Sequence, residues 1–260
     1  MKVISLQSGS KGNCIYVETA DLRLLFDAGI SGVKAQSRLA EFGRDIRDVD
    51  AVFVSHDHGD HIRSAGIFSR KFKHKLVVSE KTFACKKHML GETQILRHFT
   101  PGEKIVMGAT TITTVATPHD GVEPSVFIVE SGGKRLGILT DLGYVFEGLP
   151  EIIGGLDAVM LESNYDPYML ENGIYPRSLQ NRISGNGGHI SNEQAAMLVK
   201  EHSGTSLRWV CLSHISENNN TYDKALETHK QILSEGRLAA DLTFEIFVAS
   251  QSKAVEMPEF

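Results

Sequence analysis

The sequence predicts an α/β (α+β) fold built from two similar halves. Short apolar runs, typical of buried strands, alternate along the chain with longer segments of helical spacing. Residues 22–29 are echoed by 134–143, and residues 49–56 by 156–163, in the same order and at a similar separation. This internal repeat indicates a duplicated unit of strands and helices. Because the chain has 260 residues and 41% hydrophobic content, we expect one domain, residues 1–260, with a sizeable core.

The first half is expected to contain short strands joined by turns and helices. Apolar runs predict strands at 2–6, 15–18, 22–26, 51–54 and 76–79, and a pair of strands within 105–117. Helical spacing predicts helices at 31–42, 62–72 and 80–89, and Gly43 is a favourable C-cap for the first of them. The second of these helices carries four cations that we expect on a solvated face, namely Arg63, Arg70, Lys71 and Lys73.

The second half is expected to repeat this alternation. The echoed segments 134–143 and 156–163 supply strands, and further strands are predicted at 209–213 and 242–249. Helices are predicted at 191–202, where Ser191 and Gln194 have the spacing of a capping box, and at 222–235. Residues 166–188 lack clear periodicity, so we expect a loop there.

Four potential metal ligands follow the strand at 51–54 within six positions: His56, His58, Asp60 and His61. Imidazole and carboxylate suit Zn²⁺ and its first-row neighbours, and the absence of cysteine argues against a structural zinc knuckle. Gly59 lets the loop fold back tightly, so ligands this close in sequence can face two adjacent points. The string therefore predicts a metal centre, with Zn²⁺ as the first choice and Mn²⁺ or Fe as alternatives.

More polar residues lie where apolar strands end. His119, Asp141 and His214 each lie at or just past such an end, as His56 does. Because strand ends at one edge of a sheet converge, residues far apart in sequence can meet there. Asp27 also follows a strand; it could be a ligand, but we expect it to support one instead.

Composition narrows the class of protein. The net charge of −5 argues against a protein that binds nucleic acid with its whole surface, although it allows a local basic patch. Cys14, Cys85 and Cys211 are odd in number and set among apolar residues, which indicates reduced, buried thiols in a cytoplasmic protein. Residues 1–10 are too short and polar for a secretory signal, and no run approaches membrane-spanning length, so no membrane partner is expected.

The string His-x-His-x-Asp-His, followed by His119, Asp141 and His214, resembles the metallo-β-lactamase superfamily over essentially the whole chain. The resemblance implies a four-layer αββα sandwich with a dinuclear metal site on one edge. It implies one ion held by His56, His58 and His119, another held by Asp60, His61 and His214, and Asp141 between them. The opening Ser8-Gly-Ser-Lys-Gly-Asn13 and the string Ser213-His-Ile-Ser216 also resemble the YycJ/WalJ-type subfamily, whose expected activity is that of a 5′-to-3′ DNA exonuclease.

Residues 161–216 are also similar to transfer-RNA 3′-processing endonucleases. The matching strings are Leu161-Glu-Ser-Asn164, His189-Ile-Ser-Asn-Glu-Gln-Ala-Ala196 and Leu212-Ser-His-Ile-Ser216. This likeness implies that His189 meets the scissile phosphate or its leaving oxygen and that Glu162 orients it. Leu161 stands where those enzymes have a histidine, so the surroundings of the site differ there. The gap from His119 to Asp141 is too short for the arm with which those enzymes grip transfer RNA.

Phosphodiester hydrolysis is the first functional prediction. Two metal ions can share a hydroxide, lower its pKa and neutralise charge that accumulates on phosphorus. Asp60 can ligate a metal and orient that nucleophile, and His189 can protonate the departing oxygen. The alternative is hydrolysis of a small ester, lactone or thioester on the same dinuclear site, and a non-catalytic metal-dependent binding protein is a third reading. The pairing of Glu162 with His189 favours phosphate, since carbonyl hydrolysis at the metals does not require it.

Residues 166–188 supply candidate substrate contacts. Arg177 and Arg182 stand among tyrosines, a mixture suited to pairing with phosphates and stacking on bases. Gly188, beside Gly187, allows the backbone to approach a phosphate closely. We therefore expect a nucleic-acid substrate, with DNA favoured over RNA. An ordered surface loop is the alternative role for this stretch, and a solvent-binding loop histidine is the alternative for His189.

Overall fold

The computed structural model describes residues 1–235 and 243–260, and its strands form two seven-stranded sheets flanked by helices. The chain divides into two compact units, described separately below. The first contains residues 1–116, 121–133 and 250–259, and the second contains 117–120, 134–249 and 260. The expectation of a single domain stays a prediction. Within the described ranges, no helix combines the length and the apolar character needed to span a bilayer.

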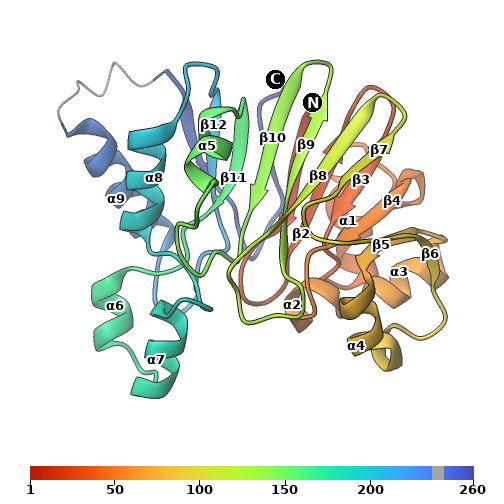
Figure 1. Cartoon of the computed structure of the whole chain (residues 1–260), viewed down its shortest axis with the longest axis horizontal. Helices are drawn as coiled ribbons and strands as arrows, with labels where there is room; N and C mark the ends of the chain where they lie inside the picture. Colours follow the sequence, from red (N-terminus) through yellow and green to blue (C-terminus); the bar gives the residue numbers. More distant parts are fainter. Residues whose placement is uncertain (236–242) are drawn as a thin grey trace. The chain divides into compact units, whose positions relative to one another are not determined.

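The first unit contains the whole of one sheet, in the order β14-β1-β2-β3-β4-β5-β6 (Figure 1). Its strands are β1 (Lys2–Gln7), β2 (Cys14–Glu18), β3 (Arg23–Phe26), β4 (Ala51–Val54), β5 (Lys75–Ser79), β6 (Gln94–Phe99) and β14 (Val255–Glu256). β3 and β4 are parallel and in register, with Phe26 opposite Phe53. These two rings stack at 5.2 Å, and each packs against Phe127 of β9 (Ser125–Ser131), which makes an aromatic centre for the core.

Helices and an antiparallel set of strands complete the first unit. The helices are α1 (Gly32–Ala40), η1 (Ile46–Asp48), α2 (Gly59–Ile62), α3 (Ala65–Phe72) and α4 (Glu80–Leu90), and β7 (Lys104–Met107), β8 (Thr110–Ala116) and β9 pair antiparallel. Ser31 and Ser79 cap α1 and α4 by accepting backbone N–H groups. The helix predicted at 62–72 is two helices, because the chain leaves helical pairing at Ser64, whose N–H donates to the carbonyl of Ala28.

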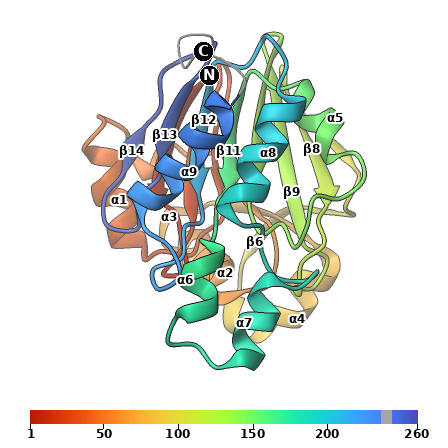
Figure 2. The ribbon, with the colours of Figure 1, turned by 90° about the vertical axis from the view of Figure 1, so that its left-hand side faces the viewer.

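The second unit is built on four parallel strands in the order β13-β12-β11-β10. These are β10 (Lys134–Leu139), β11 (Ala158–Glu162), β12 (Trp209–Ser213) and β13 (Glu245–Val248). Its helices are α5 (Leu149–Gly154), α6 (Pro167–Asn172), α7 (Arg177–Ser184), α8 (Asn192–His202) and α9 (Tyr222–Ser234), and Figure 2 shows α8 and α9 side by side. Leu139, Leu161 and Leu212 are in register, so the polar residues that follow them emerge at one edge.

Most predicted elements are present, and residues 166–188 are the main correction. The expected loop contains α6 and α7, because Asp166 caps the first helix ahead of Pro167, and Pro176 precedes the second. Helices of six and eight residues are too short to show a clear apolar period. The sequence analysis also missed β6, β9 and β14. The strand predicted at 242–249 is β13, and Leu242 lies outside the described residues.

The internal repeat corresponds to a local structural repeat. β3 and β4 form a parallel pair, as β10 and β11 do. Asp27 and Asp141 follow β3 and β10 with the same left-handed backbone, at φ values of 65° and 64°. Two residues later, Gly29 and Gly143 lie so close to backbone carbonyls that a Cβ atom would clash, at 1.6 Å from the oxygen of Asp60 and 2.0 Å from that of Asn186. The Asp-x-Gly string thus forms the same type of turn after β3 and after β10.

Candidate active site

In the first unit, the four residues of the metal-ligand string gather around one loop. β4 ends at Val54, and α2 begins directly after His58, so the loop between them is only four residues long. The ring of His56 lies 4.2 Å from that of His61 and 4.6 Å from that of His58, measured between centroids. A carboxylate oxygen of Asp60 lies 3.5 Å from Nε2 of His61. The structure therefore brings the whole predicted string together.

Asp27 and Ser55 contact the Nδ1 atoms of His61 and His56. The buried Asp27 carboxylate accepts a hydrogen bond from Nδ1 of His61 at 2.7 Å and two from the backbone and hydroxyl of Ser55, at 2.8 and 3.0 Å. Because Ser55 donates its hydroxyl proton to Asp27, its oxygen can accept Nδ1–H of His56, which lies 2.9 Å away. Asp27 thus has the contacts expected of a residue that supports the ligands.

Asn13 is a site residue that the sequence analysis did not single out. Its amide nitrogen lies 3.0 Å from Nε2 of His61 and 3.3 Å from Oδ2 of Asp60, and its side-chain oxygen accepts the N–H of Gly9. Its backbone N–H donates to the carbonyl of Asp60 at 2.7 Å. The glycine-rich string from Ser8 to Asn13 was the available signal, since Gly9 and Gly12 have positive φ values that fold it into a compact turn.

In the second unit, Glu162 is the centre of the predicted residues. It ends β11, is fully buried, and accepts five hydrogen bonds. Nδ1 of His189 and Nδ1 of His214 both donate to Oε1, at 2.9 and 2.8 Å, and the N–H of Asp141 reaches the same atom at 3.2 Å. The N–H groups of Leu142 and Ile190 donate to Oε2. Glu162 therefore holds the rings of His189 and His214 and the turn at Asp141, and its predicted part in catalysis stays a prediction.

The charge of Glu162 is maintained despite its burial. Burial by itself raises the pKa of this carboxyl, but the neighbouring imidazoles of His189 and His214 and their hydrogen bonds lower it to about 2. The group is therefore a carboxylate at neutral pH and accepts from both rings. Asp141, Glu162, His189 and His214 offer ligand atoms that all lie within 4.8 Å of one another.

His119 is held by the glycine loop that precedes His189. Nδ1 of His119 donates to the carbonyl of Gly188 at 2.9 Å, and the N–H of Asp120 donates to the carbonyl of Gly187. Nε2 of His119 lies 3.5 Å from Oδ1 of Asp141. Burial lowers the pKa of His119, which favours the neutral ring that binds metal. Gly188 thus contacts a predicted ligand through its carbonyl.

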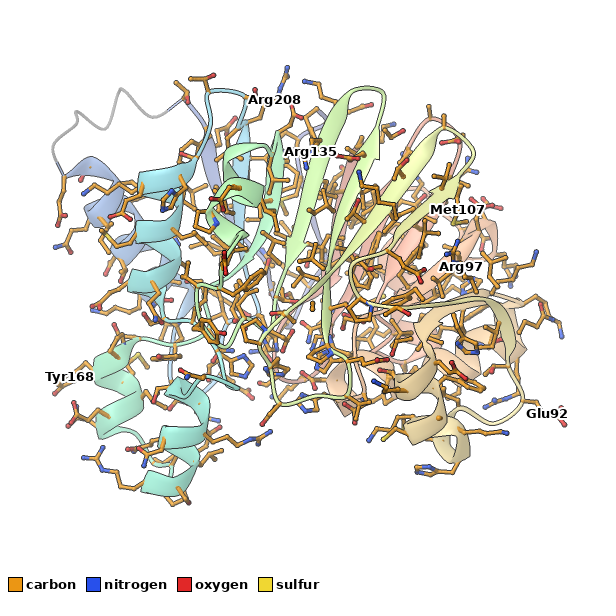
Figure 3. The ribbon with its side chains drawn as sticks, in the orientation of Figure 1. Glu92, Arg97, Met107, Arg135, Tyr168 and Arg208 are labelled. Carbon is orange, nitrogen blue, oxygen red and sulfur yellow. The ribbon has the colours of Figure 1, made fainter. Side chains whose placement is uncertain are left out.

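The two predicted arginines lie on α7 and make different contacts. Arg182 donates Nε–H to Oδ2 of Asp120 at 2.6 Å, so it braces the turn that carries His119. Arg177, at the start of α7, contacts Gln180 and lies 3.8 Å from a carboxylate oxygen of Glu171. Tyr168 projects outward from α6 and is 74% exposed (Figure 3). Tyr165, in contrast, is buried and cannot stack on a base.

Four of the predicted metal-binding histidines have Nδ1 next to an oxygen acceptor. In His56, His61, His119 and His214, Nδ1 lies within hydrogen-bond distance of a hydroxyl, carboxylate or carbonyl oxygen. An Nδ1–H donated to such an oxygen leaves the lone pair on Nε2, the usual arrangement of a histidine ligand. The chain therefore contains buried His/Asp clusters typical of a dinuclear metallo-β-lactamase site. Imidazole and carboxylate donors of this kind suit several divalent ions.

Comparison with known proteins is consistent with this site. A family model described as a beta-lactamase superfamily domain matches residues 22–215. Exodeoxyribonuclease YycJ of Bacillus anthracis is 33% identical over 243 residues, which cover 93% of this chain and 92% of the relative. Exodeoxyribonuclease WalJ of Streptococcus pneumoniae is 33% identical over 258 residues, which cover 98% of this chain and 96% of the relative.

A solved structure confirms the predicted fold. The metallo-beta-lactamase fold protein YhfI from Bacillus subtilis superposes with a TM-score of 0.71 at 17% identity, covering 98% of this chain and 99% of that one. The predicted αββα class is thus confirmed, and so is the predicted likeness to YycJ/WalJ-type proteins. The chain belongs to the metallo-β-lactamase superfamily, as a metal hydrolase of that fold.

Proposed function

We propose that this metal hydrolase is a phosphodiesterase, and more narrowly a 5′-to-3′ DNA exonuclease. The observation that carries the proposal is the hydrogen bond of 2.9 Å between Glu162 and Nδ1 of His189. It orients an imidazole whose other nitrogen, Nε2, can meet a departing alkoxide oxygen. The names of the relatives YycJ and WalJ, both called exodeoxyribonuclease, support the same class of substrate.

We assign the metal ligands as the family resemblance implies. One ion would be held by His56, His58 and His119, the other by Asp60, His61 and His214, with Asp141 shared between them. Zn²⁺ suits this donor set first, and Mn²⁺ or Fe are alternatives. When bound, two such ions supply Lewis acidity, which makes water a nucleophile near neutral pH and offsets charge on the phosphoryl group.

The side chains then have separate tasks in the proposed reaction. Asp60 orients the attacking water, and the amide of Asn13, 3.3 Å from Oδ2 of Asp60, limits the rotation of that carboxylate. His189 holds a proton on Nε2 and delivers it to the leaving oxygen of the nucleic acid. This transfer requires the doubly protonated ring: Glu162 accepts its Nδ1–H and holds its orientation, and the proton on Nε2 is the one transferred.

We assign substrate contact to Arg177, Arg182 and Gly188. The guanidinium of Arg182 uses one N–H donor on Asp120, so four donors stay available to a phosphate. Arg177 stands at the first position of α7, near the exposed ring of Tyr168 in the sequence, and the two suit phosphate pairing and base stacking. DNA is the preferred substrate over RNA in this proposal, following the relatives.

A substrate screen tests the proposal. Metal-loaded protein is incubated with DNA labelled at the 5′ or the 3′ end, with RNA, with bis-p-nitrophenyl phosphate, and with a lactone and a thioester. We expect DNA hydrolysis that releases the 5′ label first as mononucleotides. Fast turnover of the lactone or thioester with no cleavage of either nucleic acid would contradict the proposal and establish carbonyl hydrolysis instead.

A further inference from the structure

A row of cations on α3 and at its two ends, next to the metal-ligand loop, is not used by the site described above. Residues 63–98 contain nine Lys or Arg and two Glu, a net charge of +7, whereas the whole chain carries −5. The rest of the chain therefore carries −12. This segment spans α3, β5, α4 and β6, and α3 and α4 pack on each other and on β5 (Figure 1). Positive charge is thus concentrated on one part of an acidic protein.

The row consists of Arg63, Arg70, Lys71 and Lys73, and we call it the basic strip. All four side chains are exposed. Arg70 and Lys71 lie in the last turn of α3, Lys73 directly follows α3, and Arg63 ends α2 just before α3 begins. The opposite face of α3, with Phe68 and Phe72, is buried in the core. Within α3 itself, the exposed side chains are Ile67, Arg70 and Lys71.

The two arginines of the strip donate hydrogen bonds to neutral backbone carbonyls, which do not neutralise the positive charge of the guanidinium groups. Arg63 donates to the carbonyls of Gly59 and Lys11, at 2.9 and 3.2 Å, and Arg70 donates to the carbonyls of Leu90 and Glu92. Across residues 1–235 and 243–260, no carboxylate lies within ion-pair distance of any of the four cations. The carbonyls fix each guanidinium in place while leaving some of its five N–H donors for an anion.

The strip begins at the metal-ligand loop. Gly59, whose carbonyl accepts from Arg63, directly follows His58 and precedes Asp60. The eight residues of α3 extend the row by about 12 Å, the axial rise of three to four nucleotides of one strand of B-DNA. A row of cations along a helix, with its two arginines held by carbonyls, suits a linear polyanion, whereas a broad membrane surface would favour a wide patch with apolar anchors. Ile67, 47% exposed, is the apolar side chain between the arginines.

We propose that the basic strip binds the sugar-phosphate backbone of the nucleic-acid substrate beyond the nucleotide being cleaved. This inference rests on the proposed nuclease function and extends it, because it names a surface that follows the strand away from the metal-ligand loop. The contacts are electrostatic and do not read sequence. The strip should therefore control affinity for long substrates and salt dependence, and it should not affect the bond-breaking step.

The test compares charge reversals on and off the strip. The strip variant carries both Lys71→Glu and Lys73→Glu, two exposed side chains that make no helix-capping hydrogen bond. The control variant carries both Lys230→Glu and Lys253→Glu, so its net charge is the same. Arg63→Gln is a separate, milder variant. Binding of a fluorescent phosphorothioate 20-mer to the metal-loaded full chain is measured by anisotropy from 50 to 300 mM salt. Hydrolysis of the 20-mer as ordinary DNA and of bis-p-nitrophenyl phosphate is measured in parallel.

We expect the strip variant to bind the 20-mer at least about tenfold more weakly than the control at low salt, with a shallower salt slope. Hydrolysis of bis-p-nitrophenyl phosphate should be unchanged. If the strip and control variants had equal affinities and salt slopes and DNA were still degraded, the proposed role of the basic strip would be contradicted. The proposed nuclease function would be unaffected. If oligonucleotide binding depended on the strip but no phosphodiester were hydrolysed, the result would support nucleic-acid binding by the basic strip and contradict the nuclease function. Strip-dependent binding to phosphatidylserine vesicles, with oligonucleotide binding unaffected, would overturn the proposed partner.

Discussion

Nδ1 of His189 donates to Oε1 of Glu162 at 2.9 Å, and that oxygen belongs to a fully buried carboxylate. The ring can therefore use only Nε2 toward a substrate. In the proposed role the ring is an imidazolium, whose Nδ1–H is held by the buried carboxylate and whose Nε2–H is the proton to be delivered. The proposed role in protonating the leaving group can be separated by experiment from a role in metal binding.

The first prediction concerns His189→Ala. Hydrolysis of DNA should fall by about 10²- to 10⁴-fold, because an alkoxide leaving group needs a proton, whereas p-nitrophenolate leaves without one. Turnover of bis-p-nitrophenyl phosphate should be largely retained, and the metal content should not change. Glu162→Gln should show the same selectivity more mildly, with some loss of metal, because Glu162 also holds His214. An equal loss on both substrates with metals retained would indicate a phosphate-binding contact instead.

The second prediction concerns Asp27→Asn. Asparagine tolerates the left-handed backbone at this position, so the protein should fold. An amide cannot reproduce both acceptor contacts to Ser55 and His61, so metal affinity should fall by about 10- to 100-fold. Metal titration by calorimetry measures this, with the exposed Asp48→Asn as the matched control. Unchanged metal affinity in the Asp27 variant would show that Asp27 does not position His61.

The third prediction separates the two arginines of α7. Arg177→Ala should weaken oligonucleotide binding while sparing turnover of a small phosphodiester, because Arg177 contacts only neighbouring residues of the same segment. Arg182→Ala should reduce turnover of both substrates, since Arg182 braces Asp120, the neighbour of His119. Asp120→Asn should reproduce part of the Arg182 effect. If both arginine variants lost only oligonucleotide affinity, Arg182 would be a substrate contact without a bracing role.

The fourth prediction concerns acid stability. Burial within α9 lowers the pKa of His229 to about 4, and its Nδ1 donates to the carbonyl of Ala225. In the unfolded chain a histidine has a pKa of about 6.5, so the unfolded state binds a proton first as the pH falls. The stability that neutral His229 contributes is present above about pH 6.5 and is lost toward pH 4, at most about 3 kcal/mol.

His229→Leu should therefore lose less stability between pH 7 and pH 5 than the wild type does. Urea unfolding at both pH values measures the difference, and the exposed His202→Gln is the control. An identical pH dependence in wild type and His229→Leu would show that folding does not lower the pKa of His229.

Local strings allowed much of this site to be predicted from the sequence. The four predicted ligands from His56 to His61 lie within six positions, and each later predicted ligand follows an apolar strand, so periodicity and strand ends point to them. The role of Asn13 could not be predicted in the same way. Its amide reaches His61 because a glycine-rich turn folds back onto the loop, and that contact joins residues 48 positions apart.

The sequence also could not predict that His189 and His214 both donate hydrogen bonds to Glu162. It depends on the register of β11 and β12, where Glu162 lies opposite Ser213. The helices α6 and α7 were missed for a different reason. Each is too short to repeat an apolar face, and proline and glycine at their ends indicate turns as readily as helix boundaries.

The most direct test of the central claim measures metal content and DNA hydrolysis on the same preparations. Wild type, His58→Ala and Asp141→Ala are analysed by mass spectrometry for bound metal and assayed on 5′-labelled DNA. We expect the wild type to hold two divalent ions per chain and to degrade DNA from the 5′ end, and both variants to lose metal and hydrolysis together. Full DNA hydrolysis by metal-free protein, or no hydrolysis by protein that holds two ions, would contradict the account.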